Sequence, residues 1–245
     1  MSYPSHVFST SVNPVSYPCA LPLLGIITTF VTVSSVTGAH IAPIVMLIVG
    51  IAHLFADGLS MGLGDALSSK AELDYNNSER AREHWEMQVN MEGEIAEMID
   101  LYEKRGISHE DAQQIWRILA KYPHAFLDVM MAEELHLLPP NEDDNPWRGG
   151  LITCVSFMLF GVVPLLPFLL SSFPGFRWLQ EAQLPASVAL TVATLFLLGV
   201  IKARLVAQTE SWWHSGLVMS CLGSAAAAVS FLVSYSLHYF FDVEL

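Results

Sequence analysis

The sequence predicts an all-α integral membrane protein with five transmembrane helices and a helical domain inserted between spans 2 and 3. Three observations support this fold class. Hydrophobic residues make up 53% of the 245 residues and charged residues only 14%, whereas a soluble domain carries about 25% charged residues. The formal net charge is nevertheless −13, and residues 65–144 alone carry 19 acidic and 7 basic side chains. The charge therefore belongs to one soluble segment, and the rest of the chain is apolar enough for a membrane.

The apolar segments on both sides of this acidic segment are long enough to cross a bilayer, which takes about 20 apolar residues in a helix. Residues 1–56 contain no Asp, Glu, Lys or Arg, and residues 149–245 contain only seven. We expect the five spans at residues 22–38, 41–64, 150–171, 185–206 and 215–240. The expected domains are an N-terminal tail (1–21), transmembrane helices 1 and 2 (22–65), the acidic insert (66–146), and transmembrane helices 3 to 5 (147–245).

Local sequence features fit these spans. The first span is short and rich in Thr, Ser and Val, and a tight turn at residues 38–40 leads to the second. The third contains Pro164 and Pro167, which membrane helices tolerate where neighbours satisfy the freed carbonyl groups. The fifth contains the small-residue run 223–228, which allows close helix packing within the protomer or across a dimer.

The distribution of Lys and Arg sets the expected orientation, because cytosolic loops are enriched in these residues. With the insert in the cytosol, ten of the eleven basic residues are cytosolic and only Arg177 is not. The N-terminus is then cytosolic, and the C-terminus is lumenal.

The excess of acidic groups excludes nucleic acid as a partner, because few side chains can neutralise phosphates. An enzyme is not expected, because the chain has no nucleophile motif or phosphate-binding loop.

The insert is expected to be helical. Residues 66–88 lack Pro and Gly, so they continue the second span, whereas Gly93 and Gly106 interrupt the rest of the insert. Ser108, with Asp111 three residues later, resembles a helix N-cap. The expected helices cover roughly residues 66–90, 92–105, 108–121 and 123–136.

Carboxylates in the insert form a candidate metal site. Glu83 and Glu86 are three residues apart and so share a helix face, and Glu94 and Glu97 repeat this spacing. Paired carboxylates on facing helices are how helical bundles bind divalent metals. The competing interpretation is a solvated acidic helix face. No Glu-x-x-His pair occurs among these residues, so a di-iron site of the ferritin type is not expected.

A methionine pair adds a softer kind of ligand to this candidate site. Met130 lies four residues and Met131 three residues before Glu134, so these side chains are close on one helix. Carboxylates prefer hard or borderline cations, whereas a thioether favours softer ones. A mixed glutamate and methionine set therefore suits Fe²⁺ better than Mg²⁺ or Ca²⁺.

The second span carries polar side chains inside the membrane. His53, Asp57 and Met61 recur every four residues and so lie along one helix face, which Asp65 continues toward the insert. An ionisable group at the bilayer centre costs at least about 2.5 kcal/mol and is by default interpreted as functional. These groups form a candidate path for a metal ion or for protons. The alternative is an Asp57–His53 pair that is buried for packing.

These motifs resemble those of the vacuolar iron transporter family, in the branch that keeps a cytosolic metal-binding domain. The resemblance covers roughly residues 25–241. It is carried by the segments ADGLSMGLGD (56–65), LSSK (67–70), REHWE (82–86), EGE (92–94), KYP (121–123), DVMMAEE (128–134) and PLLP (164–167). The combination is specific, although each segment alone is a weak signal.

The resemblance implies five membrane helices, a homodimer, and transport of Fe²⁺ from the cytosol into a vacuole or similar acidic store in exchange for protons. It assigns the membrane path to Met61. The spacing of four residues along one helix face extends this path to Asp57, His53 and Asp65. It assigns metal binding to Glu83, Glu86, Glu94, Glu97, Met130, Met131 and Glu134. We expect Mn²⁺ or Zn²⁺ to substitute for Fe²⁺, membrane lipid as a partner, and no permanent cofactor.

The first span departs from the family pattern. The family carries an acidic residue there, and Leu24 occupies that position; the basic amphipathic helix usually found ahead of it is also missing, and His53 replaces another carboxylate. Leucine neither binds a metal nor carries a proton. Three explanations remain open. Transport relies on Asp57, His53 and Met61; or the protein is a membrane-anchored metal-binding or buffering protein that is impaired in transport; or residues 1–24 come from an incorrect exon join.

Overall fold

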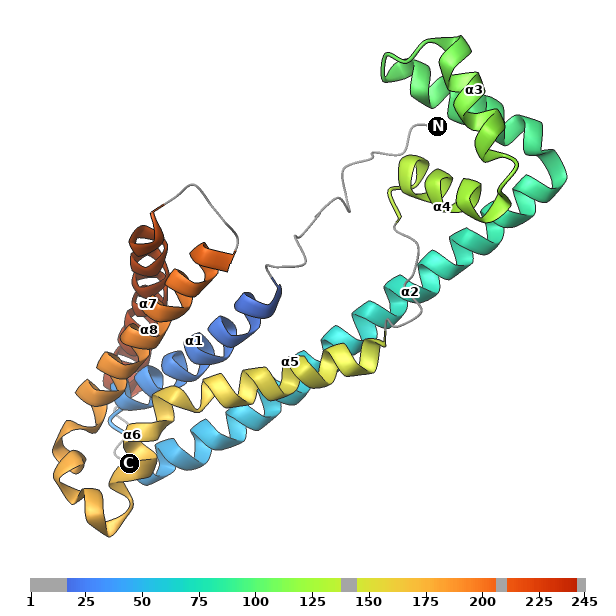
Figure 1. Ribbon diagram of the computed structural model, residues 1–245. Coiled ribbons are helices and arrows are strands. Elements are labelled where there is room, and N and C mark those ends of the chain that lie inside the picture. Colours follow the sequence, from blue (N-terminus) through green and yellow to red (C-terminus); the bar gives the residue numbers. More distant parts are fainter. Residues whose placement is uncertain (1–16, 138–144, 206–210, 242–245) are drawn as a thin grey trace. The chain divides into compact units, whose positions relative to one another are not determined.

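The computed structural model describes residues 17–137, 145–205 and 211–241. Within these residues the chain is helical and contains no β-strand (Figure 1). The all-α prediction is therefore confirmed for the described part of the chain. The elements are α1 (Tyr17–Gly38), α2 (Pro43–Lys104), α3 (His109–Leu119), α4 (Pro123–Glu134), α5 (Pro146–Gly161), η1 (Val163–Leu165), α6 (Leu166–Ser171), η2 (Pro174–Ala182), α7 (Gln183–Leu205) and α8 (Trp212–Phe241).

Contacts divide the chain into two compact units, each of which is described by itself. The apolar unit comprises Met1–Leu63 and Gly150–Leu245, and the acidic unit comprises Gly64–Gly149. The helices α2 and α5 contribute residues to both units. The expected tail at residues 1–21 differs from the structure, because α1 already begins at Tyr17, while residues 1–16 lie outside the described part.

The apolar helices match most of the expected spans. Among the described residues, four helical segments are long and apolar enough to cross a membrane: segments within Pro43–Lys104, Pro146–Ser171, Trp178–Leu205 and Trp212–Phe241. They correspond to the expected second to fifth spans. The expected first span, Pro22–Gly38, is an apolar helix that falls short of this length.

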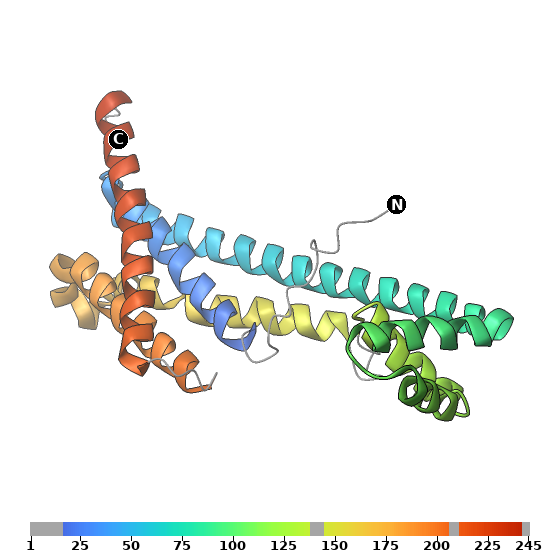
Figure 2. The same cartoon turned by 90° about the horizontal axis from the view of Figure 1, so that it is seen from above.

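Small residues let α8 pack closely against α1 and α7, which lie beside it in both views (Figures 1 and 2). The buried residues of α8 are Gly216, Ser220, Gly223 and Ala227. A Cβ on Gly38 of α1 would lie 2.6 Å from the backbone oxygen of Phe231, and a Cβ on Gly199 of α7 would lie 2.8 Å from Cα of Gly216. Close backbone approach through small residues is how membrane helices associate. Within the run 223–228, Gly223 and Ala227 are buried in the protomer, and a packing role for the rest of the run stays a prediction.

The third apolar span is interrupted where the sequence places its two prolines. α5 ends at Gly161, and η1 and α6 continue the segment. Ser187 of α7 is completely buried and donates its hydroxyl to the backbone oxygen of Pro164 at 2.6 Å. A neighbouring helix thus satisfies a carbonyl of the interrupted segment, as proline in a membrane helix requires.

The acidic unit has a hydrophobic core of its own, formed by parts of α2, α3 and α4. Trp116 is completely buried and lies edge-to-face against Tyr102 and Phe126, with ring centres 5.2 Å apart in each pair. The core residues are Met87, Ile95, Met98, Ile99, Ala112, Trp116, Phe126, Leu127, Met130 and Met131. This core fixes the three helices relative to one another and gives their polar side chains a defined arrangement.

The helix ends of the acidic unit follow local sequence signals. Gly106 has a φ of +92°, a backbone conformation that favours glycine, and it separates α2 from α3. The hydroxyl of Ser108 accepts a hydrogen bond from the backbone N–H of Asp111 at 3.2 Å, which confirms the expected N-cap. The helices expected at residues 108–121 and 123–136 correspond to α3 and α4.

Candidate metal site

The helix α2 is broken at Asn90 inside the acidic unit. Asn90 has non-helical backbone angles (φ −146°, ψ 62°), and its side-chain oxygen accepts a hydrogen bond from the N–H of Gly93 at 3.2 Å. This is the geometry of an N-cap, which begins a new helical segment. A Cβ on Gly93 would lie 2.8 Å from Cγ of Asn90, so glycine leaves room for the capping side chain. The boundary expected between residues 90 and 92 is therefore a break within α2.

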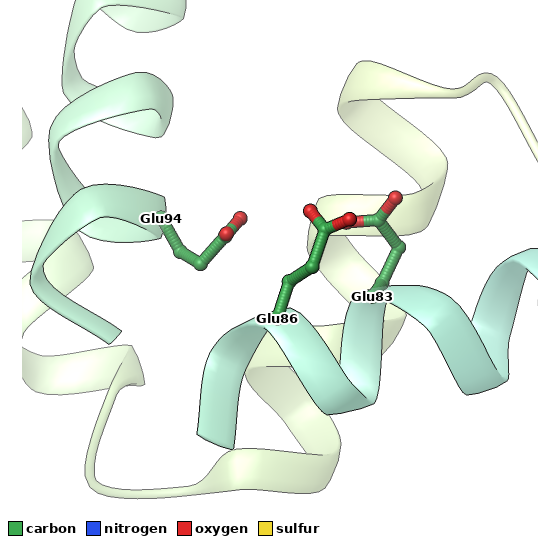
Figure 3. A group of neighbouring side chains, drawn as sticks. All are labelled: Glu83, Glu86 and Glu94. Atoms are coloured by element: carbon green, nitrogen blue, oxygen red, sulfur yellow. The ribbon is translucent and has the colours of Figure 1, made fainter. Parts of the chain in front are cut away.

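The break brings three glutamates together, here called the glutamate trio (Glu83, Glu86 and Glu94; Figure 3). Glu83 and Glu86 lie before Asn90 and Glu94 lies after it, and one oxygen of each carboxylate lies within 4.8 Å of the others. A divalent cation about 2.0–2.6 Å from each oxygen can bind donors that are up to about 4–5 Å apart. Glu83 and Glu94 are only 4% and 7% exposed. The trio could therefore hold a metal ion, with two of its carboxylates buried and the side chain of Glu86 40% exposed.

The buried carboxylate of Glu94 holds its proton unusually strongly. Burial is the main cause, followed by repulsion from the carboxylate of Glu97 and those of the rest of the trio, and together they raise the pKa of Glu94 to about 7. A metal ligand must be deprotonated to bind. If Glu94 is a ligand, metal binding near neutral pH competes with protonation of this side chain.

Two further predicted ligands lie in the same electrostatic environment. Desolvation, then the carboxylates of Glu83, Glu97 and Glu86, raise the pKa of Glu134, and the charge of Arg82 opposes this rise. Glu97 and Glu134 are nevertheless exposed side chains and lie outside the group whose oxygens come within 4.8 Å. The structure thus brings three of the five predicted glutamates into one site and places the other two near enough to act on its charge.

The two predicted methionine ligands belong to the hydrophobic core of the acidic unit. Met130 and Met131 of α4 are both completely buried, in the same cluster as Trp116 and Phe126. Packing alone accounts for that burial. Their role as soft ligands stays a prediction.

A guanidinium group accompanies the glutamate trio. Nη2 of Arg82 lies 2.7 Å from Oε1 of Glu83 and 2.9 Å from Oε2 of Glu79, and its Nε lies 3.7 Å from Oε1 of Glu86. The sequence interpretation included Arg82 in a family motif but gave neither Arg82 nor Glu79 a role. The available signal was spacing, because Glu79 and Glu86 lie three residues before and four residues after Arg82 and so share its helix face.

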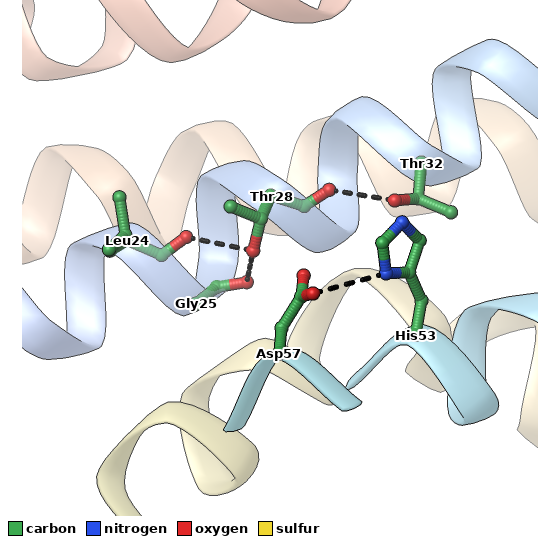
Figure 4. A network of polar contacts seen from close by, with 6 residues as sticks. All are labelled: Leu24, Gly25, Thr28, Thr32, His53 and Asp57. Carbon is green, nitrogen blue, oxygen red and sulfur yellow. Dashed lines mark hydrogen bonds and ion pairs between the residues drawn. The ribbon is translucent and has the colours of Figure 1, made fainter. Parts of the chain in front are cut away.

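In the apolar unit, two of the predicted path residues form a pair. Nδ1 of His53 lies 3.2 Å from Oδ1 of Asp57, and both side chains point toward α1 (Figure 4). Their side chains are 54% and 34% exposed in the single chain. The alternative interpretation was an Asp57–His53 pair that is buried for packing. The pair is present, but both side chains are too exposed in the single chain for packing within it to explain the pair.

The other two predicted path residues continue along α2. Met61 is half-buried and lies one turn beyond Asp57. Asp65 is half-buried and belongs to the acidic unit. The structure places Met61 on the same helix face as the His53–Asp57 pair, and the role of Asp65 stays a prediction.

The helix α1 offers the His53–Asp57 pair no carboxylate, since residues 1–56 contain none. Leu24 is 39% exposed, and its backbone oxygen accepts a hydrogen bond from the hydroxyl of Thr28 at 3.0 Å (Figure 4). Thr32 likewise donates to the backbone oxygen of Thr28, at 3.0 Å. The hydroxyls of Thr28 and Thr32 are therefore engaged with their own helix.

Comparison with known proteins gives one consistent match over most of the chain. A model of the VIT family matches residues 24–235. The vacuolar iron transporter of Plasmodium falciparum (isolate 3D7) is 37% identical over 212 residues, which cover 85% of this chain and 77% of that protein. The vacuolar iron transporter of Plasmodium berghei (strain Anka) is 35% identical over 210 residues, covering 85% and 76%. Vacuolar iron transporter 1 of Arabidopsis thaliana is 29% identical over 210 residues, covering 86% and 80%.

Proposed function

This chain belongs to the VIT family, and on that premise we propose that it transports Fe²⁺ from the cytosol across the membrane of a vacuole or similar acidic store. Its relatives are named as transporters and not as enzymes. The apolar helices fit a multi-pass membrane protein. The observation that carries the proposal is the glutamate trio, which offers a divalent cation three closely spaced carboxylates.

We propose five membrane spans, with α1 as the first. Its 22 residues extend about 33 Å at 1.5 Å per residue, close to the thickness of about 30 Å of a hydrocarbon core. The acidic unit and the N-terminus are then cytosolic, and the C-terminus is lumenal. A homodimer would cover apolar side chains of α2 such as Phe55, Leu59 and Leu63, each more than half exposed in the single chain.

In the proposed mechanism, the glutamate trio captures Fe²⁺, assisted by Glu97, Glu134, Met130 and Met131. Asp65 and Met61 then receive the ion, and the His53–Asp57 pair provides the next ligands. Protonation of carboxylate and imidazole groups by the acidic lumen weakens metal binding, because ligands bind in their deprotonated form. Proton movement toward the cytosol would reset the path. Mn²⁺ would follow the same route as a second substrate, because carboxylates discriminate poorly between these ions.

The alternative function is metal binding or buffering without transport. The observation in its favour is Leu24, at the position where the family resemblance expects an acidic residue. Transport is favoured, because named iron transporters match 84–86% of this chain.

Uptake by proteoliposomes tests the proposal. Purified protein is reconstituted into vesicles with an acidic interior, and Fe²⁺ uptake is followed under anaerobic conditions with and without the pH gradient. We expect uptake that depends on the gradient and that Met61→Ala abolishes. Met219→Ala, on α8 of the same unit, is the matched control and should leave uptake intact. Absence of uptake, or equal uptake by the Met61→Ala protein, would contradict the proposed function.

A further inference from the structure

A positive charge already lies against the carboxylates that would bind the metal. Arg82 contacts Glu83 at 2.7 Å and Glu86 at 3.7 Å, and both belong to the glutamate trio. Its third partner, Glu79, lies outside the trio at 2.9 Å. The guanidinium group of Arg82 therefore contacts two candidate metal ligands and one carboxylate, that of Glu79, which is not a candidate ligand.

The guanidinium and a bound divalent cation compete for the same oxygens. Arg82 remains charged at every pH relevant to a protein, so it cannot make way by losing a proton. It can make way only by moving. The Arg82 side chain is 51% exposed, which leaves it room to rotate, whereas its partner Glu83 has a side chain only 5% exposed and is held in place.

The carboxylate of Glu79 is an alternative ion-pair partner for the guanidinium group of Arg82. Glu79 precedes Arg82 by three residues on the same face of α2, and its side chain is 16% exposed. Arg82 can therefore release Glu83 and Glu86 and keep a charge-assisted hydrogen bond to Glu79. Such bonds are stronger than those between neutral groups, so the displaced arginine does not become an unpaired charge.

We propose that Arg82 is a displaceable counter-cation that sets the affinity of the glutamate trio for divalent metal. Without metal it neutralises part of the trio, which otherwise places three carboxylates close together, two of them buried. When a cation binds, Arg82 withdraws to Glu79. The inference rests on the metal site of the proposed function but not on transport itself. It makes the site weaker than three carboxylates alone would be, which suits a site that must pass its ion on.

Metal titration of the full-length protein in detergent tests this role. The probe is Fe²⁺ alone, added anaerobically in a calorimeter. We expect Arg82→Gln to tighten Fe²⁺ binding about five- to tenfold, because it removes the competing charge. Arg82→Lys keeps the charge and should restore affinity to near the wild-type value. Glu79→Gln removes the charged partner to which Arg82 withdraws, and it should weaken Fe²⁺ binding about two- to threefold.

A neighbouring arginine supplies the matched control. Arg80 pairs with Asp128, outside the trio, and Arg80→Gln should leave Fe²⁺ affinity unchanged. If Arg82 merely supports the fold, Arg82→Gln would weaken binding and Glu79→Gln would not, which would overturn the inference. Unchanged binding after replacing all three trio glutamates with Gln would also overturn it, whereas proteoliposome uptake decides the proposed function separately.

Discussion

The backbone N–H of Gly93 donates a hydrogen bond to the side-chain oxygen of Asn90 over 3.2 Å, at the point where α2 is broken. This bond starts the helical segment that carries Glu94. We expect Gly93→Ala to weaken Fe²⁺ binding and to cost about 1–2 kcal/mol of stability, because the new Cβ displaces the capping side chain. Anaerobic calorimetry and thermal unfolding of the detergent-solubilised protein measure the two effects.

Another glycine of α2 provides the control for this substitution. A Cβ on Gly64 would meet no atom within 4 Å, so Gly64→Ala should change neither Fe²⁺ affinity nor the cap. Equal Fe²⁺ affinity in Gly93→Ala and wild-type protein would show that the cap does not position Glu94.

The raised pKa of Glu94 predicts how the metal-free protein responds to pH. Burial and neighbouring carboxylates raise this pKa from 4.5 to about 7 on folding. The folded state therefore holds the proton more tightly than the unfolded state, and stability is lost as pH rises from about 4.5 through 7. We expect Glu94→Gln to stabilise the metal-free protein at pH 8 by roughly 1–3 kcal/mol and to have little effect near pH 4.5. Thermal unfolding at both pH values measures this, with the exposed Glu92→Gln as control. An unchanged pH dependence in Glu94→Gln would be inconsistent with this prediction.

The same pKa predicts proton release when metal binds. Near pH 7, about half of the Glu94 side chains carry a proton that the cation must displace. Below pH 7, Fe²⁺ affinity should fall by about tenfold per pH unit, because one proton is exchanged. Calorimetry in buffers of different ionisation enthalpy counts the released protons. Affinity that stays constant between pH 6 and 8 would rule out Glu94 as a ligand.

Restoring a carboxylate on α1 tests the significance of Leu24. In proteoliposomes, Leu24→Asp should increase Fe²⁺ uptake, because the new carboxylate supplies the charge that the family resemblance places on this helix. Leu24→Asn is the matched control, of similar size but without an ionisable group, and should not increase uptake. Equal uptake by both variants would mean that charge at this position is not what limits transport.

The hydrogen bond from Ser187 to the backbone oxygen of Pro164 should stabilise the interrupted third span. Ser187→Ala removes the donor and leaves a buried carbonyl without this partner, which costs about 1–3 kcal/mol. A lower unfolding temperature in detergent is the expected result. Ser236→Ala removes a hydroxyl that bonds only within its own helix, to Leu232, and should change stability less. A larger drop in unfolding temperature for Ser236→Ala than for Ser187→Ala would contradict this role for Ser187.

Local spacing predicted those parts of the acidic unit that depend on near neighbours. The N-cap at Ser108 and the pairing of Glu83 with Glu86 on one face follow from separations of three residues along a helix. The meeting of Glu94 with Glu83 depends on the direction in which the chain turns at Asn90. Packing of the core around Trp116 decides that direction, and periodicity carries no information about it.

Spacing alone does not distinguish a metal ligand from a packing residue. The structure buries Met130 and Met131 in the core, where they pack whether or not they also bind metal, so their predicted ligand role stays a prediction. The sequence interpretation used Arg82 to set the orientation and as part of a family motif, but it did not place the guanidinium group among the trio's carboxylates. The first apolar segment agrees with the predicted span at Pro22–Gly38, and the helix α1 that contains it begins earlier, at Tyr17.

The close contacts of Gly38 and Gly199 also limit how this protein can diverge. In each case the nearest obstacle to a side chain is a backbone atom of α8, which no change of rotamer can move aside. A surface residue can change freely, and a metal ligand can change when the transported ion changes. These two positions are constrained only by the distance between the helices. Among descendants of this gene we therefore expect glycine to persist at both positions even where selection for a particular metal has been relaxed.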